Sequence, residues 1–301
     1  MQGLFLCNKP SGPSSAQFLN EFKRTLHIPR EVRVGHGGTL DPFAEGLLVV
    51  GVSRAYTKQL NQPLLHETKE YETEILLGAS SDTDDKTGKI SPAHILHMEQ
   101  FANSRELANK KIRDAIRELQ KREEQAPPIY SAIKLEGKAA YKRARAGEDF
   151  SLKNKKVKLL DYEIKKIETK DNLIILEINM LVSAGFYIRS FARDLGQLLD
   201  IGGYVQALKR VKIGDFSLKN ALNLDDFDKT MTLYVREPDG AKNGSFSELI
   251  KPARSGLKIE TKSEGGILTI RGKLNDLQIV LEQINNYAKE HDILIQNWFG
   301  K

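Results

Sequence analysis

Apolar positions in the first fifty residues predict a strand, a helix and a second strand. Residues 3–8 form a short apolar run that stops at the turn sequence KPSGP. Residues 47–52, LLVVGV, are continuously apolar, which is typical of a strand buried on both faces. Between them, apolar side chains recur at helical spacing behind two serines that can cap a helix. The members of this apolar helical face are Phe18, Leu19, Phe22 and Leu26.

The middle of the chain mixes strand and helix patterns. Residues 71–77 alternate between apolar and polar, as in a strand with one wet face, and the polar loop SSDTDDKTGK follows them. Residues 105–124 are highly charged and carry a thin apolar stripe, which predicts a surface helix. The remaining elements are predicted from the same patterns: strands at 156–168 and 172–182, a helix at about 187–199 and a shorter helix at 204–210.

The C-terminal quarter has a different character. Residues 229–258 show little apolar periodicity and contain EPDGAKNGS, which is typical of a linker or an irregular arm. The apolar pattern then returns and predicts a strand–helix–strand unit. Its parts are the strand ILTIRG, a helix from about 275 to 290 and the strand ILIQNWFG. This unit is either a small second domain or an edge addition to the first.

Adjacent antiparallel strands with flanking helices, without an internal repeat, predict an α+β fold rather than a doubly wound sheet. The main sheet is expected to be mixed and largely antiparallel, with a small atypical α/β appendage at the C-terminus. The expected organisation is a main domain over 1–225 with a helical and basic insertion at about 100–150, a linker over 226–258, and the small C-terminal unit over 259–301.

The net charge of +6 is concentrated in one segment. Residues 134–158 hold nine Lys or Arg against three acidic residues, so this segment accounts for the surplus of the whole chain. One interpretation is an ordinary solvated face. The other is a surface that contacts phosphates, since such contacts supply most of the sequence-independent affinity for nucleic acid. Charge alone leaves both interpretations open.

Several protein classes lack support in the sequence. No run approaches the roughly 18 apolar residues of a membrane helix, and residues 1–12 read as a strand rather than a signal peptide. A single cysteine, Cys7, excludes an internal disulfide, so we expect a reducing cytoplasm. The histidines show no metal-ligand spacing, and the glycine-rich loops that bind nucleotides are missing.

The loop VGHGGTLDPFAEG at 34–46 contains a single aspartate, Asp41, followed by proline. Glycines around it allow a close approach of backbone to a ligand or a positive φ. Asp41 either caps an ordinary turn or acts as a covalent nucleophile. As a nucleophile it needs a nearby cation to stay ionised, because burial alone raises the pKa of a carboxyl group.

Arg189 stands in the first turn of the helix predicted at 187–199. A cation is unfavourable there, because the helix dipole is positive at that end. We therefore expect Arg189 to face a carboxylate rather than solvent.

Together these segments resemble the TruB family of tRNA pseudouridine synthases, in the family's order and over about three quarters of the chain. The match in the loop around Asp41 is long enough to be a strong signal by itself. QAPPIYSAIK and the basic segment resemble the stand-alone bacterial type more than the guide-RNA-dependent archaeal and eukaryotic relatives. The segments that carry the resemblance are KPSG at 9–12, GHGGTLDPFAEG at 35–46, KEY at 69–71, SSDTDD at 80–85, QAPPIYSAIK at 125–134, GFYIR at 185–189, DLG at 194–196 and LKR at 208–210.

The resemblance implies isomerisation of uridine 55 in the T-loop of tRNA to pseudouridine, without metal, cofactor or redox change. Asp41 matches the family's nucleophilic aspartate, Tyr71 the tyrosine that stacks on the target base, and Arg189 the arginine paired with the aspartate. Whether Asp41 attacks the ribose or the base is left open. The residues expected to line the substrate pocket are His36, Gly38, Tyr187 and Leu208.

The resemblance also implies a tRNA partner, bound through the T-arm, and no obligate protein partner. The residues expected to contact RNA are Lys9, Lys134, Lys138, Lys142, Arg143 and Arg145. Two alternatives stay open: an RNA-binding chaperone that keeps the scaffold, and a guide-RNA-dependent catalytic subunit.

The departure from the family pattern is C-terminal. Family members usually end in an RNA-binding β-barrel of the PUA type, whereas residues 229–301 do not read as one. Any role of these residues in RNA contact stays open.

Overall fold

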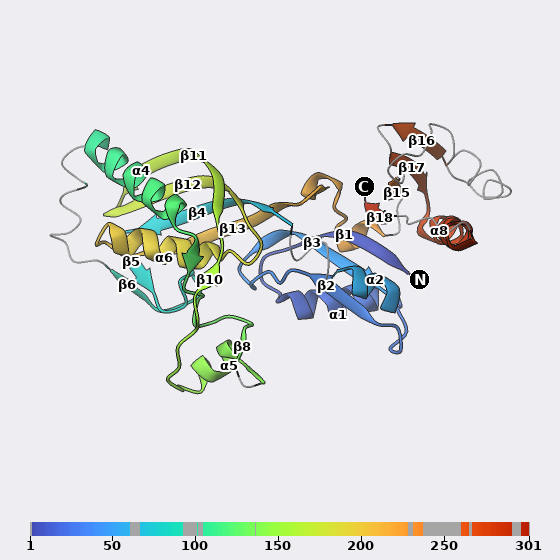
Figure 1. The fold of residues 1–301 in the computed structure, drawn as a ribbon, viewed down its shortest axis with the longest axis horizontal. Coiled ribbons are helices and arrows are strands. Elements are labelled where there is room, and N and C mark those ends of the chain that lie inside the picture. Colours follow the sequence, from blue (N-terminus) through green and yellow to red (C-terminus); the bar gives the residue numbers. More distant parts are fainter. Residues whose placement is uncertain are drawn as a thin grey trace. The chain divides into compact units, whose positions relative to one another are not determined.

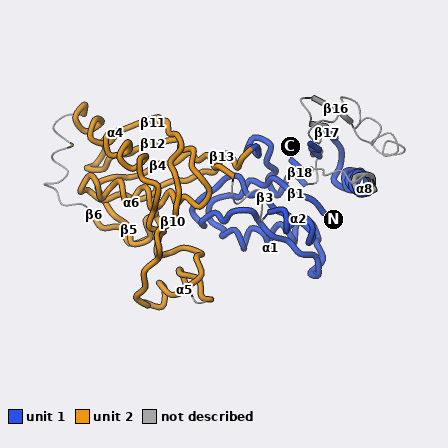
Figure 2. The backbone as a smooth tube through the Cα atoms, in the orientation of Figure 1, with its two compact units in different colours: residues 1–65, 215–301 blue, residues 66–214 orange. Residues whose placement is uncertain are grey.

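The computed structural model arranges the chain in two units (Figure 2). Unit 1 comprises residues 1–65 and 215–301, and unit 2 comprises residues 66–214. The structure describes residues 2–60, 67–92, 101, 105–135, 137–227, 231–236, 260–264, 267–290 and 296–300.

Unit 1 is built on a sheet with strand order β3-β1-β18-β15-β17-β16, and β2 pairs with the other edge of β3 (Figure 1). The β1–β18 pair is parallel and the other pairs are antiparallel. The elements are β1 (Gly3–Lys9), α1 (Ser15–Thr25), β2 (Val34–Gly37), β3 (Glu45–Val52), α2 (Arg54–Gln59), β14 (Phe216–Ser217), η1 (Leu218–Asn220), η2 (Leu224–Asp226), β15 (Met231–Arg236), β16 (Glu260–Glu264), β17 (Ile267–Gly272), α8 (Leu274–Glu290) and β18 (Gln296–Gly300).

The core of unit 1 is aromatic at its centre. Phe5 of β1 stacks on Phe299 of β18, with ring centroids 4.7 Å apart, and meets Phe22 of α1 edge to face. The apolar side of α8 joins the same cluster through Leu277 and Ile284. Residues from both ends of the chain therefore share one core.

The sequence predicted the N-terminal elements of unit 1 correctly. β1, α1 and β3 lie where the patterns place them, and β3 is buried along almost its whole length. Ser14 caps α1 in a capping box with Gln17, whose side chain accepts a hydrogen bond from the Ser14 N–H in return.

The C-terminal prediction needs a correction. Residues 231–236 are the buried strand β15 and not part of an irregular arm, because β15 pairs with both β17 and β18. The rest of the predicted linker, 237–258, lies outside the described residues. The predicted strand–helix–strand unit is present as β17, α8 and β18, and it extends the sheet of unit 1 through the β1–β18 pair. The two units divide the chain at residues 65/66 and 214/215, whereas the sequence predicted one domain boundary at 225.

Unit 2 is built on an antiparallel sheet with strand order β11-β12-β4-β13. Helix α6 packs on β13 and β4, and α4 packs on β11 and α6. The elements are β4 (Lys69–Leu77), β5 (Ala79–Ser81), β6 (Ile90–Pro92), α4 (Arg105–Lys121), β7 (Glu124–Gln125), β8 (Lys134–Leu135), β9 (Lys138–Ala139), α5 (Ala140–Arg145), β10 (Lys155–Lys156), β11 (Leu159–Lys170), β12 (Leu173–Val182), α6 (Ile188–Leu198) and β13 (Gly203–Ile213).

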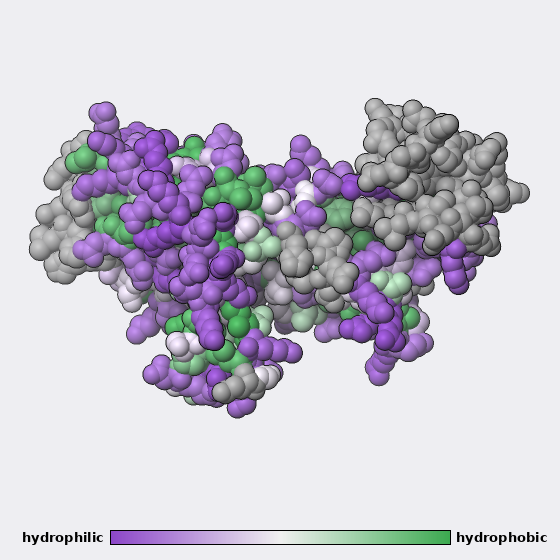
Figure 3. Space-filling model, in the orientation of Figure 1, coloured by the Kyte–Doolittle hydropathy of each residue, from purple (hydrophilic) through white to green (hydrophobic). Residues whose placement is uncertain are grey.

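The charged helix α4 lies across unit 2 with its apolar stripe inward. Its outer side contributes to a largely hydrophilic surface (Figure 3). The buried residues of α4 are those of the predicted stripe: Ala108, Ile112, Ala115, Ile116 and Leu119.

Residues 203–213 form strand β13, so the short helix predicted over 204–210 is wrong. β13 pairs with β4, and its register shifts between Val205 and Ala207 and again between Arg210 and Lys212. At each bulge an extra residue breaks the strict alternation of inward and outward side chains. The resulting spacing of apolar residues imitates a helical pattern.

Residues 126–154 form an excursion between β7 and β10, which pair antiparallel as a separate short stem. This excursion contains the β8–β9 hairpin and α5, which lie apart from the sheet in Figure 1. The basic segment 134–158 thus begins in the excursion and ends just after the stem.

The fold is a mixed sheet with flanking helices, so the α+β expectation is confirmed. None of the described helices is both long enough and apolar enough to span a membrane.

Candidate active site

Asp41 lies in the loop between β2 and β3, and hydrogen bonds hold this loop on both sides of it. The Ser15 hydroxyl, at the start of α1, donates to Leu40 O at 2.8 Å and accepts from the Leu40 N–H at 2.9 Å. After Asp41, the Ser11 hydroxyl donates to Phe43 O at 2.8 Å. The half-buried Asp41 side chain is therefore carried by a fixed backbone.

Two predicted pocket residues precede Asp41 in the same unit. His36 is half-buried on β2, opposite Val50 of β3. Gly38 has a φ of +80°, a conformation that glycine adopts without strain. A residue with a side chain at this position would strain the turn that leads to Asp41.

Lys9 does not lie on a surface and is corrected from an RNA contact to a structural residue. It is fully buried, and its ammonium group donates to Pro10 O at 2.8 Å and Pro13 O at 2.7 Å. These bonds hold the KPSGP turn that leads into α1. A buried ammonium group needs such acceptors, because desolvation is otherwise costly.

Arg189 faces a carboxylate in unit 2, as the sequence predicted. It lies in the first turn of α6 and is 5% exposed. Its Nη1 lies 3.5 Å from Asp85 Oδ2 and donates to Thr83 O at 3.1 Å, and its Nη2 donates to Tyr130 O at 2.9 Å. The guanidinium group thus joins the β5–β6 loop to the loop after β7.

Asp85 lies in the segment SSDTDDKTGK, which was predicted to be a polar loop, and it was not predicted as a site residue. The Thr83 hydroxyl and the Thr87 N–H both donate to Asp85 Oδ1, at 3.0 and 2.9 Å. The backbone on both sides of Asp85 pairs with Val205 of β13. The run of acidic residues in SSDTDD, next to a strand, could have indicated a site. It did not indicate which of the acidic side chains is buried.

Tyr71 and Leu208 lie on the same face of the sheet of unit 2. Tyr71 of β4 stands opposite Arg210 of β13, and Thr73 stands opposite Leu208. Side chains at directly opposed positions, and at every second position along a strand, share a face. Tyr71 and Leu208 are each 7% exposed.

Two buried cations accompany Tyr71 on this face and were not predicted as site residues. Arg210 is almost fully buried, and Lys69 is also buried. Burial, together with the nearby Arg210 guanidinium and against the opposing effect of Glu67, lowers the pKa of Lys69 to about 8. No signal in the sequence indicated them, because Arg210 fell in a predicted helix and Lys69 lay before the strand predicted at 71–77.

Tyr187 is the residue before α6 and is held from two sides. Its N–H donates to Gln125 Oε1 at 2.9 Å, and its carbonyl accepts from Gln125 Nε2 at 3.1 Å. The Lys155 ammonium lies over its ring, 5.7 Å from the centroid. Gln125 belongs to the segment QAPPIYSAIK, and its pattern in the sequence indicated no role for it.

The basic segment contains exposed and paired cations. Lys134, Lys142 and Arg145 are exposed. Arg143 Nε lies 2.8 Å from Glu148 Oε2, and Lys138 is 4.0 Å from the same carboxylate. The predicted contact residues therefore differ in how much of their charge is already balanced.

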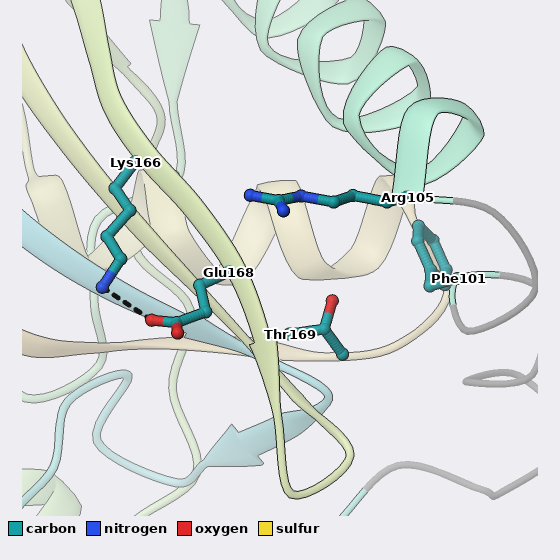
Figure 4. A pocket seen from close by; sticks show the side chains of 5 residues that line it. All are labelled: Phe101, Arg105, Lys166, Glu168 and Thr169. Carbon is teal, nitrogen blue, oxygen red and sulfur yellow. Dashed lines mark ion pairs between the residues drawn. The ribbon is translucent and has the colours of Figure 1, made fainter.

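A cavity of about 330 Å³ lies elsewhere in unit 2, between β11 and the start of α4 (Figure 4). Lys166 and Glu168 pair across its wall at 2.6 Å. None of the predicted site residues lines it. Among the described residues, no group of His, Cys, Asp and Glu side chains is arranged to hold a metal ion. The cavity is lined by Phe101, Arg105, Lys166, Glu168 and Thr169.

Two family models match the chain. The model described as "TruB family pseudouridylate synthase (N terminal domain)" matches residues 23–188. The model described as "tRNA pseudouridylate synthase B C-terminal domain" matches residues 189–258. The two matches meet between Ile188 and Arg189, at the start of α6.

The chain is also similar to proteins named tRNA pseudouridine synthase B. The protein of Corynebacterium diphtheriae is 37% identical over 227 residues, which cover 75% of this chain and 72% of the relative. That of Mycobacterium tuberculosis is 37% identical, with 74% and 71% covered. That of Prochlorococcus marinus is 36% identical, with 77% and 69% covered.

Among solved structures, one chain of "Crystal Structure of a Cbf5-Nop10-Gar1 Complex" superimposes with a TM-score of 0.53 at 25% identity. The match covers 75% of this chain and 53% of that chain, so this chain spans about half of its length.

Proposed function

Because this chain belongs to the TruB family of pseudouridylate synthases, we propose that it converts uridine 55 in the T-loop of tRNA to pseudouridine. The observation that carries the proposal is the 37% identity, over most of both chains, to proteins named tRNA pseudouridine synthase B. In this reaction the bond from C1′ to N1 breaks and a bond from C1′ to C5 forms. N1 gains a proton and C5 loses one.

Asp41 is the proposed nucleophile. Support comes from the loop that carries it, because hydrogen bonds from Ser15 and Ser11 hold the backbone on either side. A nucleophile held in place avoids the entropic cost of being positioned during the reaction. The glycine at position 38 leaves room for RNA to approach the carboxylate closely.

Arg189 is the proposed cation that keeps Asp41 ionised, since a nearby positive charge lowers the pKa of a carboxyl group. Two backbone carbonyls and Asp85 already orient its guanidinium group within unit 2. An arginine with five donors can serve these acceptors and a further carboxylate. Its burial makes its charge more effective than that of an exposed cation.

The target nucleotide must leave the stacked T-loop to react, at a cost of a few kcal/mol. Tyr71 is the proposed stacking surface, and such stacking returns about 1–3 kcal/mol. Leu208 shares its face of the sheet and is the proposed pocket floor. His36 and Tyr187 complete the proposed pocket.

The exposed cations of the basic segment are the proposed contacts to the T-arm. Lys134, Lys142 and Arg145 would fix the RNA through phosphates without reading bases. Lys138 and Arg143 belong to the same surface, with part of their charge balanced by Glu148.

The test is the Asp41→Asn variant with a tRNA transcript that carries tritium at C5 of its uridines. Pseudouridine formation releases the tritium, so the variant should lose activity by at least about a thousandfold, as expected when a covalent step is removed. Asp225→Asn, at an exposed carboxylate of the same unit, is the matched control and should keep full activity. Tritium release by Asp41→Asn at the wild-type rate would refute the nucleophile.

The guide-RNA-dependent alternative is tested by the same assay with purified wild-type chain and no other component. We expect release of tritium from a tRNA transcript under these conditions. A requirement for a second RNA or protein would favour the alternative. Tight tRNA binding without any release would favour an RNA chaperone.

A further inference from the structure

Gln125 occupies an unusual place for a glutamine, because it is 6% exposed and both ends of its amide group are used. It accepts from the N–H of Tyr187 and donates to the carbonyl of the same residue. A side-chain amide in this arrangement imitates the paired peptide group of a neighbouring strand. Gln125 thus fixes the backbone of Tyr187 rather than merely touching its side chain.

The peptide that Gln125 holds is the entry to α6. Tyr187 is the N-cap residue of α6, has an extended conformation and offers no side-chain cap. Its carbonyl also accepts the first hydrogen bond of the helix, from the Phe191 N–H at 3.1 Å. The direction in which the chain enters α6, and hence the place of Arg189 two residues later, depends on this peptide.

Further contacts from α6 reach the loop that follows Gln125. The Ser190 hydroxyl and Arg193 Nη2 both donate to Ala126 O, at 2.8 and 3.0 Å. Arg189 donates to Tyr130 O, farther along the same loop. Hydrogen bonds therefore connect this loop to the first two turns of α6.

The basic segment is attached to the same residues. Gln125 pairs with Lys155 in the β7–β10 stem, and Lys155 lies over the Tyr187 ring. The chain enters the excursion that contains α5 directly after Gln125. Gln125, a single buried residue, thus connects the basic segment to Tyr187 and to the first turn of α6.

We propose that Gln125 is a positioning residue: its two hydrogen bonds to Tyr187 set the pocket ring and the entry of α6, and so the place of Arg189, relative to the basic segment. The proposal rests on the proposed function for its effect on turnover. It predicts that loss of the bonds lowers kcat while tRNA binding, which depends on the exposed cations, is kept.

The sharpest variant is Gln125→Glu, which changes little in shape. The introduced carboxylate still accepts from the Tyr187 N–H but cannot donate to the Tyr187 carbonyl. At pH 8 the carboxylate oxygen that replaces the amide N–H faces the Tyr187 carbonyl oxygen without a proton between them. This displaces the Tyr187 peptide, so kcat at pH 8 should fall about tenfold. Protonation of the introduced carboxyl group restores a donor, so the ratio of variant to wild-type kcat should rise towards one as the pH falls to about 5.5.

The matched control is Glu124→Gln, at the exposed neighbour on β7. It should keep a kcat ratio of one at every pH. For Gln125→Glu, the KM for tRNA should stay within about twofold of the wild-type value, because phosphate contacts supply most of the affinity. A ratio of one at all pH values, a loss confined to KM, or a loss that does not depend on pH would each overturn the proposal.

A second measurement separates this proposal from the proposed function and stands if Gln125→Glu fails to fold. In Gln125→Ala, hydrogen exchange at the Tyr187 amide should be at least about tenfold faster than in wild type, since the amide loses its acceptor. Exchange at the β12 amides should not change. Unchanged exchange at Tyr187 overturns the positioning role, whereas a wild-type protein that makes no pseudouridine refutes the function alone.

Discussion

Asp84 shows how the fold changes the charge of a single side chain. Burial raises the pKa of its carboxyl group from 3.8 to about 6, while Arg193, with Nη1 3.3 Å away, and Arg189 oppose the shift. The neighbouring carboxylates of Asp194 and Asp85 add smaller upward contributions. In the unfolded chain Asp84 ionises near its ordinary pKa, so between about pH 4 and pH 6 the folded state binds more protons than the unfolded state. This group therefore makes the protein less stable as the pH rises through that window.

The Asp84→Asn variant keeps the neutral form at every pH. It should match wild type near pH 4 and exceed its free energy of unfolding by about 2–3 kcal/mol above pH 6. Urea unfolding followed by circular dichroism from pH 4 to pH 8 measures the difference. Asp82→Asn, at an exposed position of the same loop, is the control and should show no such trend. An Asp84→Asn variant less stable than wild type at pH 7 would contradict the assigned cause.

Individual residues differed in how far the sequence could predict them. The misfit of Arg189 with the helix dipole indicated a carboxylate partner, and the structure confirms one in Asp85. The identity of that partner depends on the β5–β6 loop folding onto Val205 of β13, a long-range event without a local pattern. Lys9 failed as an RNA contact because a charge next to a turn looks exposed in a sequence, whereas here the turn carbonyls surround it.

The element that carries the basic segment contains charges of two kinds. Arg143 is half-buried and shares a short ion pair with Glu148, so part of its charge is already balanced. Lys142 and Arg145 flank it on α5 and are exposed, with Arg145 placed 5.8 Å from the Tyr141 ring centroid. The exposed pair should therefore dominate any phosphate contact made by α5.

The double variant Lys142→Gln and Arg145→Gln should bind tRNA more weakly and with a flatter dependence on salt. Each lost phosphate contact reduces the slope of log affinity against log salt by about one. Filter binding between about 50 and 200 mM salt gives the slope. Lys110→Gln with Lys121→Gln on α4 removes the same charge elsewhere in unit 2 and should leave it unchanged. Equal slopes for both double variants would mean that only net charge matters.

Most elements were predictable because their patterns are local. The stripe of α4 and the alternation of β4 and β12 follow directly from burial on one side. β13 was not predictable, because its two bulges disturb the alternation that identifies a strand. β15 was missed because a strand of six residues lay within a segment whose surroundings read as a linker.

The whole molecule has one cysteine and one tryptophan, and both belong to unit 1. Cys7 lies in the core on β1, where burial raises the pKa of its thiol. Trp298 on β18 is 6% exposed and stacks on Tyr234, with centroids 5.4 Å apart. Thiol reactivity and tryptophan fluorescence therefore both report on unit 1.

In a urea titration, reaction of Cys7 with an aromatic disulfide reagent should begin at the concentration at which Trp298 fluorescence changes. The native thiol should react far more slowly than a free thiol, because it is neither exposed nor ionised. The Cys7→Ala variant supplies the blank. Rapid labelling before any fluorescence change would show that β1 opens independently of β18. That result would contradict a core shared by the two strands.

The division into units was beyond the sequence patterns. A parallel pair between β1 and β18 joins residues from opposite ends of the chain, with Phe5 opposite Phe299. Such pairing depends on the assembled core and leaves no signal in either segment. The sequence therefore predicted the strand–helix–strand unit but left open whether it stands alone or extends the sheet.

The ends of unit 2 have a consequence for engineering the protein. The Gly214 N–H donates to Thr68 O at 2.9 Å, and Lys69 stands opposite Ile213 where β4 begins and β13 ends. Unit 2 is thus inserted into the sequence of unit 1, which supplies the residues before and after it (Figure 2). The first and last strands of this insert, β4 and β13, are paired neighbours. A short bridge between residues 67 and 214 would therefore have to span only the gap between two paired strands.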